Sequence, residues 1–411
     1  MSGGVVIIGA GQAGVQAALS LREGGFQDPI TLIGSEPYAP YQRPPLSKTF
    51  LNEGSAPESL YFKPREALEK RNIRLLDDTA VAAIDRASRA VQLTDGRAVA
   101  FDRLILATGA RNRPLPLPGG NAPNVHMLRG IDDALALRLS LDHAAKAVII
   151  GGGFIGLEVA ASLRKQSIEV TLLEAGQRLC ARACLPETSV ALLDHQRAIG
   201  VDVRLGAQVT EITTTDGNAS GVRLGDVAYL QADLVLTCVG VLPNDELARE
   251  AQLGCDNGVV VDASLRTNDP DIFAIGDCAQ FPCPVHGRAV RLESVPNAAA
   301  QGRHVAAVIL GSDAPFRAMP WFWSDQGDLK LQMAGASMPV GPLSDVKVVR
   351  TEKGQVAYSF ANDRLKSVEC INSPADFVTA RKLLTDGYAP SRADLVDADW
   401  NLRALAKSRA A

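Results

Sequence analysis

Two short glycine-rich stretches have the spacing of dinucleotide-binding turns: GAGQAG at residues 9–14 and GGGFIG at residues 151–156. In a Gly-x-Gly-x-x-Gly turn, the first glycine allows a tight turn, the second lets the backbone approach a pyrophosphate, and the third lets a helix pack against a strand. The start of that helix offers unpaired N–H groups and a positive dipole end to the phosphates. The sequence therefore predicts two dinucleotide sites, one at Gly9, Gly11 and Gly14 and the other at Gly151, Gly153 and Gly156.

An acidic residue follows each glycine turn at a similar distance. Glu36 and Glu174 each lie about twenty residues beyond their turn, where a carboxylate accepts hydrogen bonds from ribose hydroxyls. Because turn, helix and acid occur together twice, the alternative of two purely structural glycine turns is disfavoured. Glu174 would repel a 2′-phosphate and favours NADH over NADPH. Arg178 and Arg182 lie nearby, however, and leave the strictness of that preference open.

Two dinucleotide sites in one chain have a common chemical reason, which is hydride transfer between a nicotinamide and a flavin. We therefore expect FAD in the first site and NADH in the second. Hydride passes directly between the two rings once they are stacked, so no acid–base residue is strictly required. The five histidines fit this expectation, since His126, His143, His195, His286 and His304 form neither a metal-ligand nor a triad pattern.

The elements around the two turns read as two βαβ units, so we expect an α/β protein. It would contain two Rossmann-like dinucleotide-binding domains and a C-terminal α+β domain that starts near residue 320. The stretch RNRPLPLPGG at 111–120 is typical of a crossover between domains. Expected strands are 5–8, 29–33, 147–150 and 169–173, with helices from each turn to about residues 22 and 165 and another at 293–310 that has Pro296 in its first turn.

Composition limits the classes of protein that need to be considered. A chain of 411 residues predicts two or three domains. Its net charge of −4 provides no overall basic field for nucleic acid or for an acidic membrane surface. The apolar runs are far too short to span a bilayer, and the first residues do not have the pattern of a signal peptide. We expect a soluble cytoplasmic protein.

The seven cysteines are scattered and include no CxxC pair. A zinc site or an iron–sulfur cluster held by this chain is therefore not expected. Most of the cysteines should be reduced, buried thiols, because free cysteine behaves as a small apolar residue. Electrons taken from NADH must then leave to an acceptor outside the chain.

The motifs taken together resemble the oxygenase-coupled NADH-dependent ferredoxin reductases, in order and over nearly the whole chain. RPPLSK combined with WFWSDQ is more specific than either glycine turn. The resemblance implies a glutathione-reductase-like fold, with an FAD domain at 1–112 and 241–320, an NADH domain at 113–240, and a C-terminal domain at 321–411 that covers the flavin. The motifs that carry it are GAGQAG, RPPLSK, ATGA, GGGFIGLE, CVGVLPN, AIGDCA, ESVPNA and FWSDQ.

The resemblance also implies individual site residues. For NADH it implies the second glycine turn with Glu158, Glu174 and Gly240. The acid Glu158 would lie near the nicotinamide and pair with Lys48. For FAD it implies the first glycine turn together with Glu36, Arg43, Pro44, Lys48, Thr108, Gly109, Asp277, Val295, Pro296 and Trp323.

Three of these roles have a chemical reason of their own. Reduced flavin carries negative charge at one end, and a helix that begins at Pro296 would stabilise it by about 1 kcal/mol. Lys48 is cationic and could donate a hydrogen bond where hydride arrives; a buried lysine needs a partner, and Glu158 is an acid in the right motif. The alternatives are a solvated loop lysine at position 48 and ordinary core packing for Trp323.

The electron acceptor expected from the resemblance is a separate [2Fe–2S] ferredoxin that supplies a cytochrome P450 or a ring dioxygenase. NADH gives two electrons together and such a cluster takes one, so the flavin must release them singly. Ferredoxins are acidic, and Arg303, His304 and Lys330 are candidate docking residues. The alternative for these three is ordinary solvated basic side chains. The resemblance also implies a monomer.

Other functions of the same fold remain open at this point. A rubredoxin reductase or a monodehydroascorbate reductase would differ only in its acceptor. An NADH-sensing flavoprotein resembling apoptosis-inducing factor would bind NADH without rapid turnover. A disulfide reductase or a cysteine-dependent NADH oxidase would need a thiol within residues 41–48, where YQRPPLSK contains no cysteine.

Overall fold

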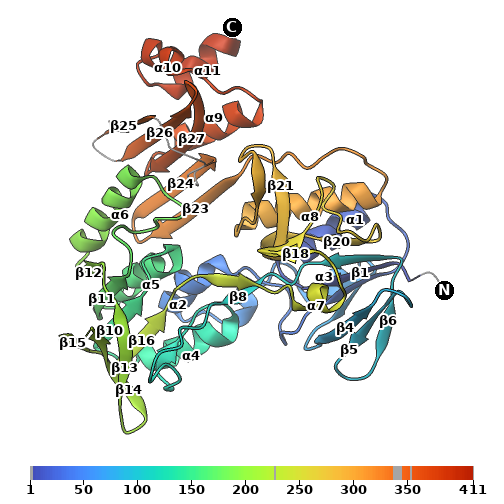
Figure 1. Ribbon diagram of the computed structural model, residues 1–411, viewed down its shortest axis with the longest axis horizontal. Coiled ribbons are helices and arrows are strands. Elements are labelled where there is room, and N and C mark those ends of the chain that lie inside the picture. Colours follow the sequence, from blue (N-terminus) through green and yellow to red (C-terminus); the bar gives the residue numbers. More distant parts are fainter. Residues whose placement is uncertain (1–2, 226–227, 337–344, 352–353, 411) are drawn as a thin grey trace. The chain divides into compact units, whose positions relative to one another are not determined.

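The computed structural model describes residues 3–225, 228–336, 345–351 and 354–410. The chain divides into two compact units, each assembled from three separate segments (Figure 1). The first unit contains Met1–Gln42, Pro57–Arg111 and Leu242–Pro320, and the second contains Arg43–Ala56, Asn112–Val241 and Trp321–Ala411. Strands β8 (Ala110–Asn112) and β17 (Val241–Pro243) lie where the chain passes from one unit to the other.

The first unit is built on a five-stranded parallel sheet with the order β20-β7-β1-β2-β3. Its central strands are buried on both faces and consist almost entirely of Val, Ile and Leu, as expected for a parallel sheet covered on both sides. The bounds of the strands and of the two long helices are β1 (Val5–Ile8), β2 (Ile30–Ile33), β3 (Ile73–Leu76), β7 (Arg103–Leu106), β20 (Ile272–Ala274), α1 (Gln12–Glu23) and α8 (Val295–Ile309).

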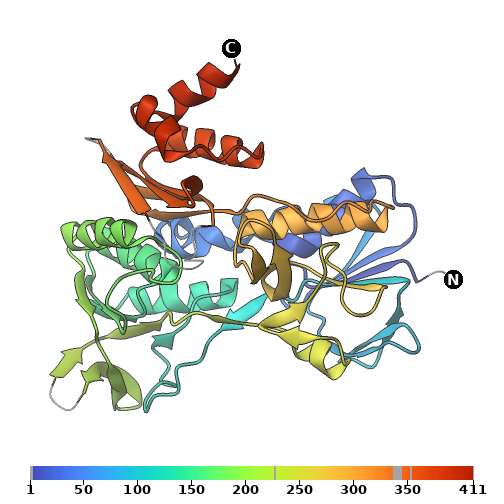
Figure 2. The ribbon, with the colours of Figure 1, turned by 45° about the horizontal axis from the view of Figure 1, so that its top comes forward.

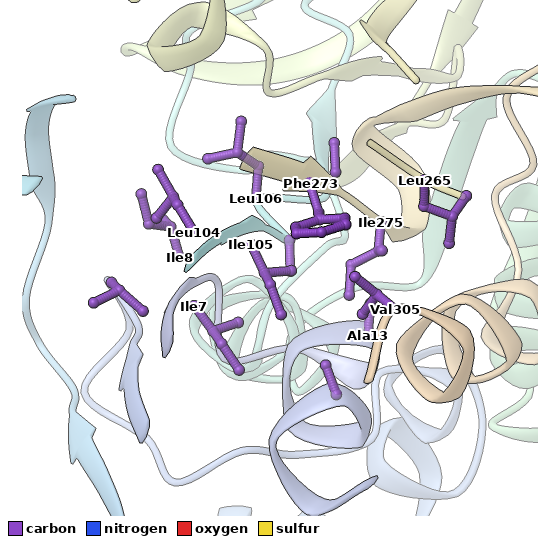
Figure 3. Packing of buried hydrophobic residues seen from close by; sticks show 14 of the residues in the cluster. Ile7, Ile8, Ala13, Leu104, Ile105, Leu106, Leu265, Phe273, Ile275 and Val305 are labelled. Carbon is purple, nitrogen blue, oxygen red and sulfur yellow. The ribbon is translucent and has the colours of Figure 1, made fainter. Parts of the chain in front are cut away.

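The core of the first unit lies between this sheet and its helices (Figure 3). Ile105 of β7 is in register with Ile7 of β1 on one side and with Phe273 of β20 on the other. Ala13 of α1 and Val305 of α8 lie close together in Figure 3, beside the end of β20. Close packing of these small and branched side chains fixes the strand ends from which the first glycine turn projects.

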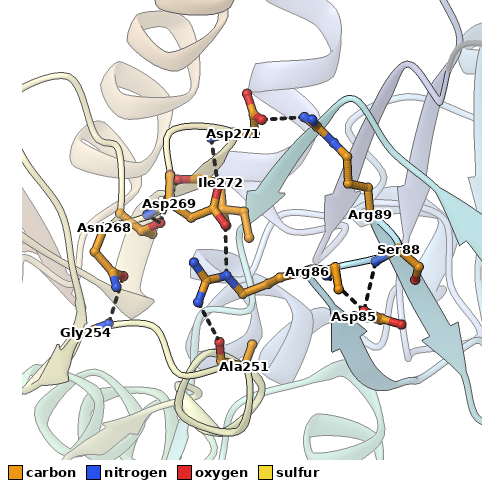
Figure 4. Close-up of polar contacts among 12 residues, drawn as sticks. Asp85, Arg86, Ser88, Arg89, Ala251, Gly254, Asn268, Asp269, Asp271 and Ile272 are labelled. Carbon is orange, nitrogen blue, oxygen red and sulfur yellow. Dashed lines mark hydrogen bonds and ion pairs between the residues drawn. The ribbon is translucent and has the colours of Figure 1, made fainter.

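The remaining elements of the first unit form two small sheets, β4-β5-β6 and β18-β19-β21-β22, and several short helices. Ion pairs join the β4-β5-β6 region to the start of β20: Arg86 Nε lies 2.8 Å from Asp269 Oδ2, and Arg89 pairs with Asp271 (Figure 4). The bounds are η2 (Pro57–Leu60), α3 (Arg65–Glu69), β4 (Val81–Asp85), β5 (Ala90–Leu93), β6 (Ala98–Ala100), α7 (Glu246–Glu250), β18 (Cys255–Asp256), β19 (Gly258–Val260), η3 (Gly276–Cys278), β21 (Ala279–Cys283) and β22 (Arg288–Val290).

The second unit repeats the architecture with a parallel sheet in the order β12-β11-β10-β16-β9. A three-stranded antiparallel sheet, β13-β14-β15, adds apolar side chains to the core beside β10 and β16. The bounds are η1 (Pro44–Ser47), α2 (Thr49–Glu53), β9 (Val125–His126), α4 (Ile131–Leu141), β10 (Lys146–Ile150), α5 (Phe154–Lys165), β11 (Glu169–Glu174), α6 (Pro186–Ala198), β12 (Asp202–Leu205), β13 (Val209–Thr215), β14 (Asn218–Leu224), β15 (Ala228–Gln231) and β16 (Leu234–Thr237).

The last part of the second unit is a five-stranded antiparallel sheet, β23-β24-β27-β26-β25, with helix α9 packed on β24 and β27 (Figure 2). The bounds are β23 (Trp321–Gln326), β24 (Leu329–Gly335), β25 (Asp345–Arg350), β26 (Gln355–Ala361), β27 (Arg364–Ile371), α9 (Pro374–Thr385), α10 (Arg392–Asp397) and α11 (Leu402–Ala410). This is the mixed α+β character that the sequence predicts after residue 320.

The strands and helices expected around the glycine turns are present, with bounds that differ by at most two residues. The predicted domain division remains a proposal; the two compact units place Arg43–Ala56, the loop that includes RPPLSK, with the second unit. Among the described residues, no helix has both the length and the apolar character needed to cross a membrane.

Candidate functional site

The two glycine turns have nearly the same backbone geometry. Gly9 and Gly151 both have φ of 114°, which side chains rarely adopt. A Cβ at Gly14 would lie 2.0 Å from the carbonyl oxygen of Gly9, and one at Gly156 would lie 2.2 Å from that of Gly151. These four glycines are therefore required by the turn itself and by the helix that packs against it.

The middle glycines of the two turns are different, because packing within the chain does not require them. A Cβ on Gly11 or on Gly153 would meet no described atom within 4 Å. Each of these residues is the N-cap of its helix and has no side-chain cap, so the first N–H groups of α1 and α5 are available to an anion. Both positions fit the close approach of a pyrophosphate, as the sequence predicts.

Around the first turn, Thr108 and Gly109 are fixed by a residue that sequence reasoning missed. Asn244 donates through Nδ2 to the carbonyl oxygen of Thr108 at 2.9 Å, and Thr108 Oγ1 donates to the carbonyl oxygen of Asn244 at 2.6 Å. The backbone N–H of Asn244 also donates to Gly109, at 3.0 Å. The motif CVGVLPN contains Asn244, but nothing in the sequence reveals which loop it contacts.

Asp277 lies half-buried in η3, directly after Gly276, and Gly276 contacts Gln301 of α8, a second residue that the sequence does not mark. Gln301 is fully buried, and its Oε1 accepts from the backbone N–H of Gly276 at 2.7 Å. Its Nε2 has no hydrogen-bond partner among the described residues. Because buried polar groups normally have partners, this amide fits a site that a bound molecule completes.

The other FAD candidates of the first unit lie at the ends of regular elements. Glu36 follows β2 and accepts a hydrogen bond from the hydroxyl of Tyr41. Val295 and Pro296 open α8, where the side chain of Ser294 caps the helix by accepting from Asn297 N at 3.2 Å. The predicted helix start at Pro296 is therefore present.

In the second unit, both oxygens of Glu174 are bound to the glycine turn and its neighbour. Oε2 accepts from Gly152 N and Oε1 accepts from Gly176 N, each at 2.7 Å. Arg178 donates to the carbonyl oxygens of Ala181 and Cys184, both at 2.7 Å, so its guanidinium is used within the chain. A guanidinium committed in this way is not available to a 2′-phosphate.

The predicted ion pair between Lys48 and Glu158 is present, with 2.5 Å between Lys48 Nζ and Glu158 Oε2. Glu158 is only 4% exposed. Two serines that the sequence interpretation did not include also donate to it, Ser47 Oγ at 2.5 Å and Ser324 Oγ at 2.7 Å. Gln326 Nε2 lies 3.4 Å from Ser324 Oγ. A buried carboxylate with these partners is fixed in position.

The other flavin candidates of the second unit lie in η1 and β23. Arg43 Nη1 donates to the carbonyl oxygen of Arg129 at 2.7 Å, and Pro44 begins η1. Trp323 is half-buried on β23, and its ring centroid lies 5.6 Å from that of Trp321. These contacts within the unit are consistent with both interpretations of Trp323, a flavin contact and ordinary packing.

Gly240 of the NADH candidates has a φ of 98° and follows β16 by three residues. Two residues before it, burial raises the pKa of the Cys238 thiol to about 12, and the nearby Glu158 carboxylate adds to the effect. Burial likewise raises the pKa of Cys255, Cys278 and Cys283. Thiols of this kind remain protonated and are poor nucleophiles, which disfavours a disulfide-reductase mechanism.

The three docking candidates have different surroundings. Arg303 and Lys330 are exposed. His304 is half-buried, with its ring centroid 5.3 Å from that of Phe316, and burial lowers its pKa. The lowered pKa favours the neutral imidazole at pH 7, so His304 is not a candidate for a docking charge.

Comparison with known proteins identifies relatives along nearly the whole chain. Residues 3–302 match the family described as pyridine nucleotide-disulphide oxidoreductase, and residues 321–406 match the one described as reductase C-terminal. The chain is 44% identical over 402 residues to rhodocoxin reductase of Rhodococcus erythropolis, which covers 97% of this chain and 93% of that protein.

Two solved structures are similar over the same length. The ferredoxin reductase for the CYP199A2 system of Rhodopseudomonas palustris has a TM-score of 0.93 and 40% identity, covering 97% of this chain and 98% of the other. The covalent complex of putidaredoxin reductase with putidaredoxin also gives a TM-score of 0.93, with 38% identity and 98% of each chain covered.

Proposed function

Because this chain belongs to the pyridine nucleotide-disulphide oxidoreductase family, we propose that it is an NADH-dependent, FAD-containing reductase of a separate iron–sulfur ferredoxin. The comparisons confirm the predicted family, the glutathione-reductase-like α/β fold, and FAD and NAD(H) as cofactors. The observation that carries the function is the similarity over nearly the whole chain to reductases named for rhodocoxin, putidaredoxin and a P450-system ferredoxin. The choice of NADH rather than NADPH is part of the proposal.

Each unit contributes residues with distinct tasks. In the first unit, Gly11 and the start of α1 would hold a pyrophosphate and Glu36 a ribose, and in the second Gly153, α5 and Glu174 would do the same. The chemistry that FAD would supply when bound is the conversion of a two-electron hydride transfer into the release of single electrons.

The Lys48–Glu158 pair keeps a cation and an anion fixed together in a largely buried position. Glu158 holds the ammonium group of Lys48, and the donors Ser47 and Ser324 hold Glu158. We propose that Lys48 presents a fixed positive charge to the reacting rings and that its neighbours orient it. A fixed charge costs no reorganisation during the reaction.

The acceptor is proposed to be a [2Fe–2S] ferredoxin that supplies a cytochrome P450 or a ring dioxygenase. Arg303 and Lys330 are the proposed docking cations, because both are exposed and an acidic partner would be steered by positive charge. Replacing Arg303 by Glu should weaken ferredoxin reduction and leave ferricyanide reduction unchanged. An equal loss with both acceptors would remove Arg303 from the docking surface.

The function is tested with the purified protein loaded with FAD. We expect NADH to reduce ferricyanide and also a [2Fe–2S] ferredoxin, with rubredoxin and monodehydroascorbate as poorer acceptors. NADH binding without turnover would instead support the NADH-sensing alternative. The monomeric state and cytoplasmic location expected from the sequence stay predictions, to be checked by light scattering and cell fractionation.

A further inference from the structure

Glu369 of β27 is a fully buried carboxyl group with no part in the function proposed above. Its Oε1 and Oε2 both lie 3.1 Å from the backbone nitrogen of Leu185, whose N–H donates to them. Leu185 is the N-cap residue of α6 and has no side-chain cap of its own, and Pro186 follows it. A carboxyl group from the C-terminal sheet therefore accepts hydrogen bonds from the first backbone N–H of this helix.

Leu185 belongs to a segment, residues 178–189, that is fixed by its own hydrogen bonds. Besides its two carbonyl contacts, Arg178 Nη1 donates to Ser189 Oγ at 2.9 Å. Ser189 Oγ in turn donates to the carbonyl oxygen of Leu179 at 2.6 Å. Cys184 N donates to the carbonyl oxygen of Cys180 at 3.0 Å. These hydrogen bonds connect the part of the segment around Leu185 to Leu179 and Cys180.

The same segment contacts the second glycine turn at Gly152. Cys180 N donates to the carbonyl oxygen of Gly152 at 2.9 Å. The side chain of Leu179 packs against Gly152, where a Cβ would lie 2.6 Å from Leu179 Cδ2. On its other side, Gly152 N donates to Glu174. Gly152 directly precedes Gly153, where the pyrophosphate of NADH is expected.

We propose that Glu369 is a positioning residue for NADH: by holding Leu185 it fixes the 178–189 segment, which holds the backbone of Gly152. The inference rests on the proposed function, because that function assigns NADH to the second turn. All the contacts in the path lie within the second compact unit. The path gives the C-terminal sheet a role in nucleotide affinity that no residue of the glycine motif reveals.

The charged and titratable groups around Glu369 give the inference a pH dependence. Glu187 lies on α6, Arg178 and Cys184 lie on the segment, and Cys370 follows on β27. The residues in register with Glu369 on the neighbouring strands, Met333 of β24 and Ala357 of β26, carry no charge.

Burial raises the pKa of Glu369 to about 7, and the charge of Glu187 adds to the rise. The Thr188 side chain, the N–H of Leu185 and the charge of Arg178 oppose it. The ionised form therefore accumulates as pH rises through about 7. A carboxylate accepts a hydrogen bond more strongly than a carboxylic acid does, so NAD⁺ affinity should improve over the same range.

The test uses full-length, FAD-loaded protein with Glu369→Gln, which keeps the size and one acceptor but removes the charge. At about pH 8 the Kd of NAD⁺ from calorimetry should rise about tenfold, with a smaller change in kcat than in the KM for NADH. At about pH 6 the wild type and the variant should converge, because both then carry a neutral group at this position. Hydrogen exchange of the amides of residues 179–185 should be faster in the variant.

A matched control is Ser367→Ala on the same strand, which removes a buried hydrogen bond to Ser359 at 2.6 Å and does not touch Leu185. It should leave the Kd of NAD⁺ and its pH profile unchanged. Glu369→Leu, a second variant, should weaken NAD⁺ at both pH values. An unchanged Kd and pH profile in Glu369→Gln would overturn the inference alone, whereas a wild type that neither binds NAD⁺ nor oxidises NADH would overturn the proposed function with it.

Discussion

Helices α1 and α5 both begin at a Gly-x-Gly-x-x-Gly turn, but they differ in the side chain that lies two residues after the third glycine. In both, an arginine at the matching position ties down the following loop: Arg22 donates to the carbonyl oxygen of Phe26, and Arg164 to that of Ile168. Two residues beyond the third glycine, however, α1 has Gln16 and α5 has Glu158. Gln16 is half-buried and donates to Ser20 at 3.0 Å, one turn along its own helix.

Glu158, at the equivalent position, is buried and bound by residues from outside its helix. Its donors are Lys48 and Ser47 in the loop containing RPPLSK and Ser324 in β23. The two turns thus share their backbone geometry, and the proposed dinucleotide sites differ in whether the side chain two residues after the third glycine is part of a buried ion pair. The following predictions test whether the glycine turns serve nucleotide binding while the Lys48–Glu158 pair serves the reaction.

The largest effect is expected at the third glycines, where the two turns should behave alike. In Gly14→Ala and in Gly156→Ala, the new Cβ would lie 2.0 and 2.2 Å from a backbone oxygen, which must move. We expect each variant to lose about 3 kcal/mol of stability, measured by denaturant unfolding. A marked loss in only one of them would show that the two turns are not built alike.

Alanine substitutions at the middle glycines, Gly11 and Gly153, should weaken FAD binding and NADH binding separately. Gly11→Ala should leave the fold intact, because its Cβ meets no described atom, but should weaken FAD binding about 100-fold. Gly153→Ala should retain FAD and weaken NADH to a similar extent. The measurements are flavin content after dialysis and the Kd of NAD⁺; loss of flavin from Gly153→Ala would contradict the assignment of the two sites.

Substitutions two residues after the third glycine, at Glu158 and at Gln16, should distinguish an effect on the reaction from an effect on nucleotide binding. Glu158→Gln leaves the largely buried Lys48 without its counter-charge and should lower kcat for ferricyanide reduction by NADH about tenfold. Gln16→Ala, the matched change in α1, should have little effect because the partners of Gln16 among the described residues, Ser20 and Arg303, lie in the first unit. Equal losses in the two variants would remove the special role given to Glu158.

The smallest effect is expected at the acids that follow the turns. Glu174→Ala should weaken NADH about fivefold through the lost ribose hydrogen bonds. It should not create a preference for NADPH, because Arg178 remains bonded to Ala181, Cys184 and Ser189. The kcat/KM ratio of the two nucleotides measures this, with Glu36→Ala as the control that leaves the ratio unchanged. A reversal to NADPH would show that Arg178 can leave its internal partners.

Much of the fold could be predicted from the sequence because its signals are local. The strand at Val5–Ile8 is an apolar run between glycines, and its predicted bounds are those of β1. The first turn of α8 was predicted from Pro296, and the helix begins at Val295. The small sheets β4-β5-β6 and β13-β14-β15 are not predicted from the sequence, because their strands alternate weakly and are defined by pairing.

The candidate site was predicted less completely than the fold. The family resemblance predicts an ion pair between Lys48 and Glu158, and the structure contains that pair. Ser47, Ser324 and Gln301 were not foreseen, since serine and glutamine are common and no spacing marks them. Their roles depend on which distant segment each one reaches.

The sequence by itself determined the two cradles, because a turn with φ of 114° and a helix packed on a strand place steric demands that only glycine meets. The tertiary structure decided that the buried ion pair, Lys48–Glu158, involves the helix of the second turn and not that of the first. Hydrogen bonds such as those from Ser47 and Ser324 to Glu158 and from Leu185 to Glu369 join residues far apart in the chain. Such contacts have no local steric signature and exist only once the sheets and helices have packed.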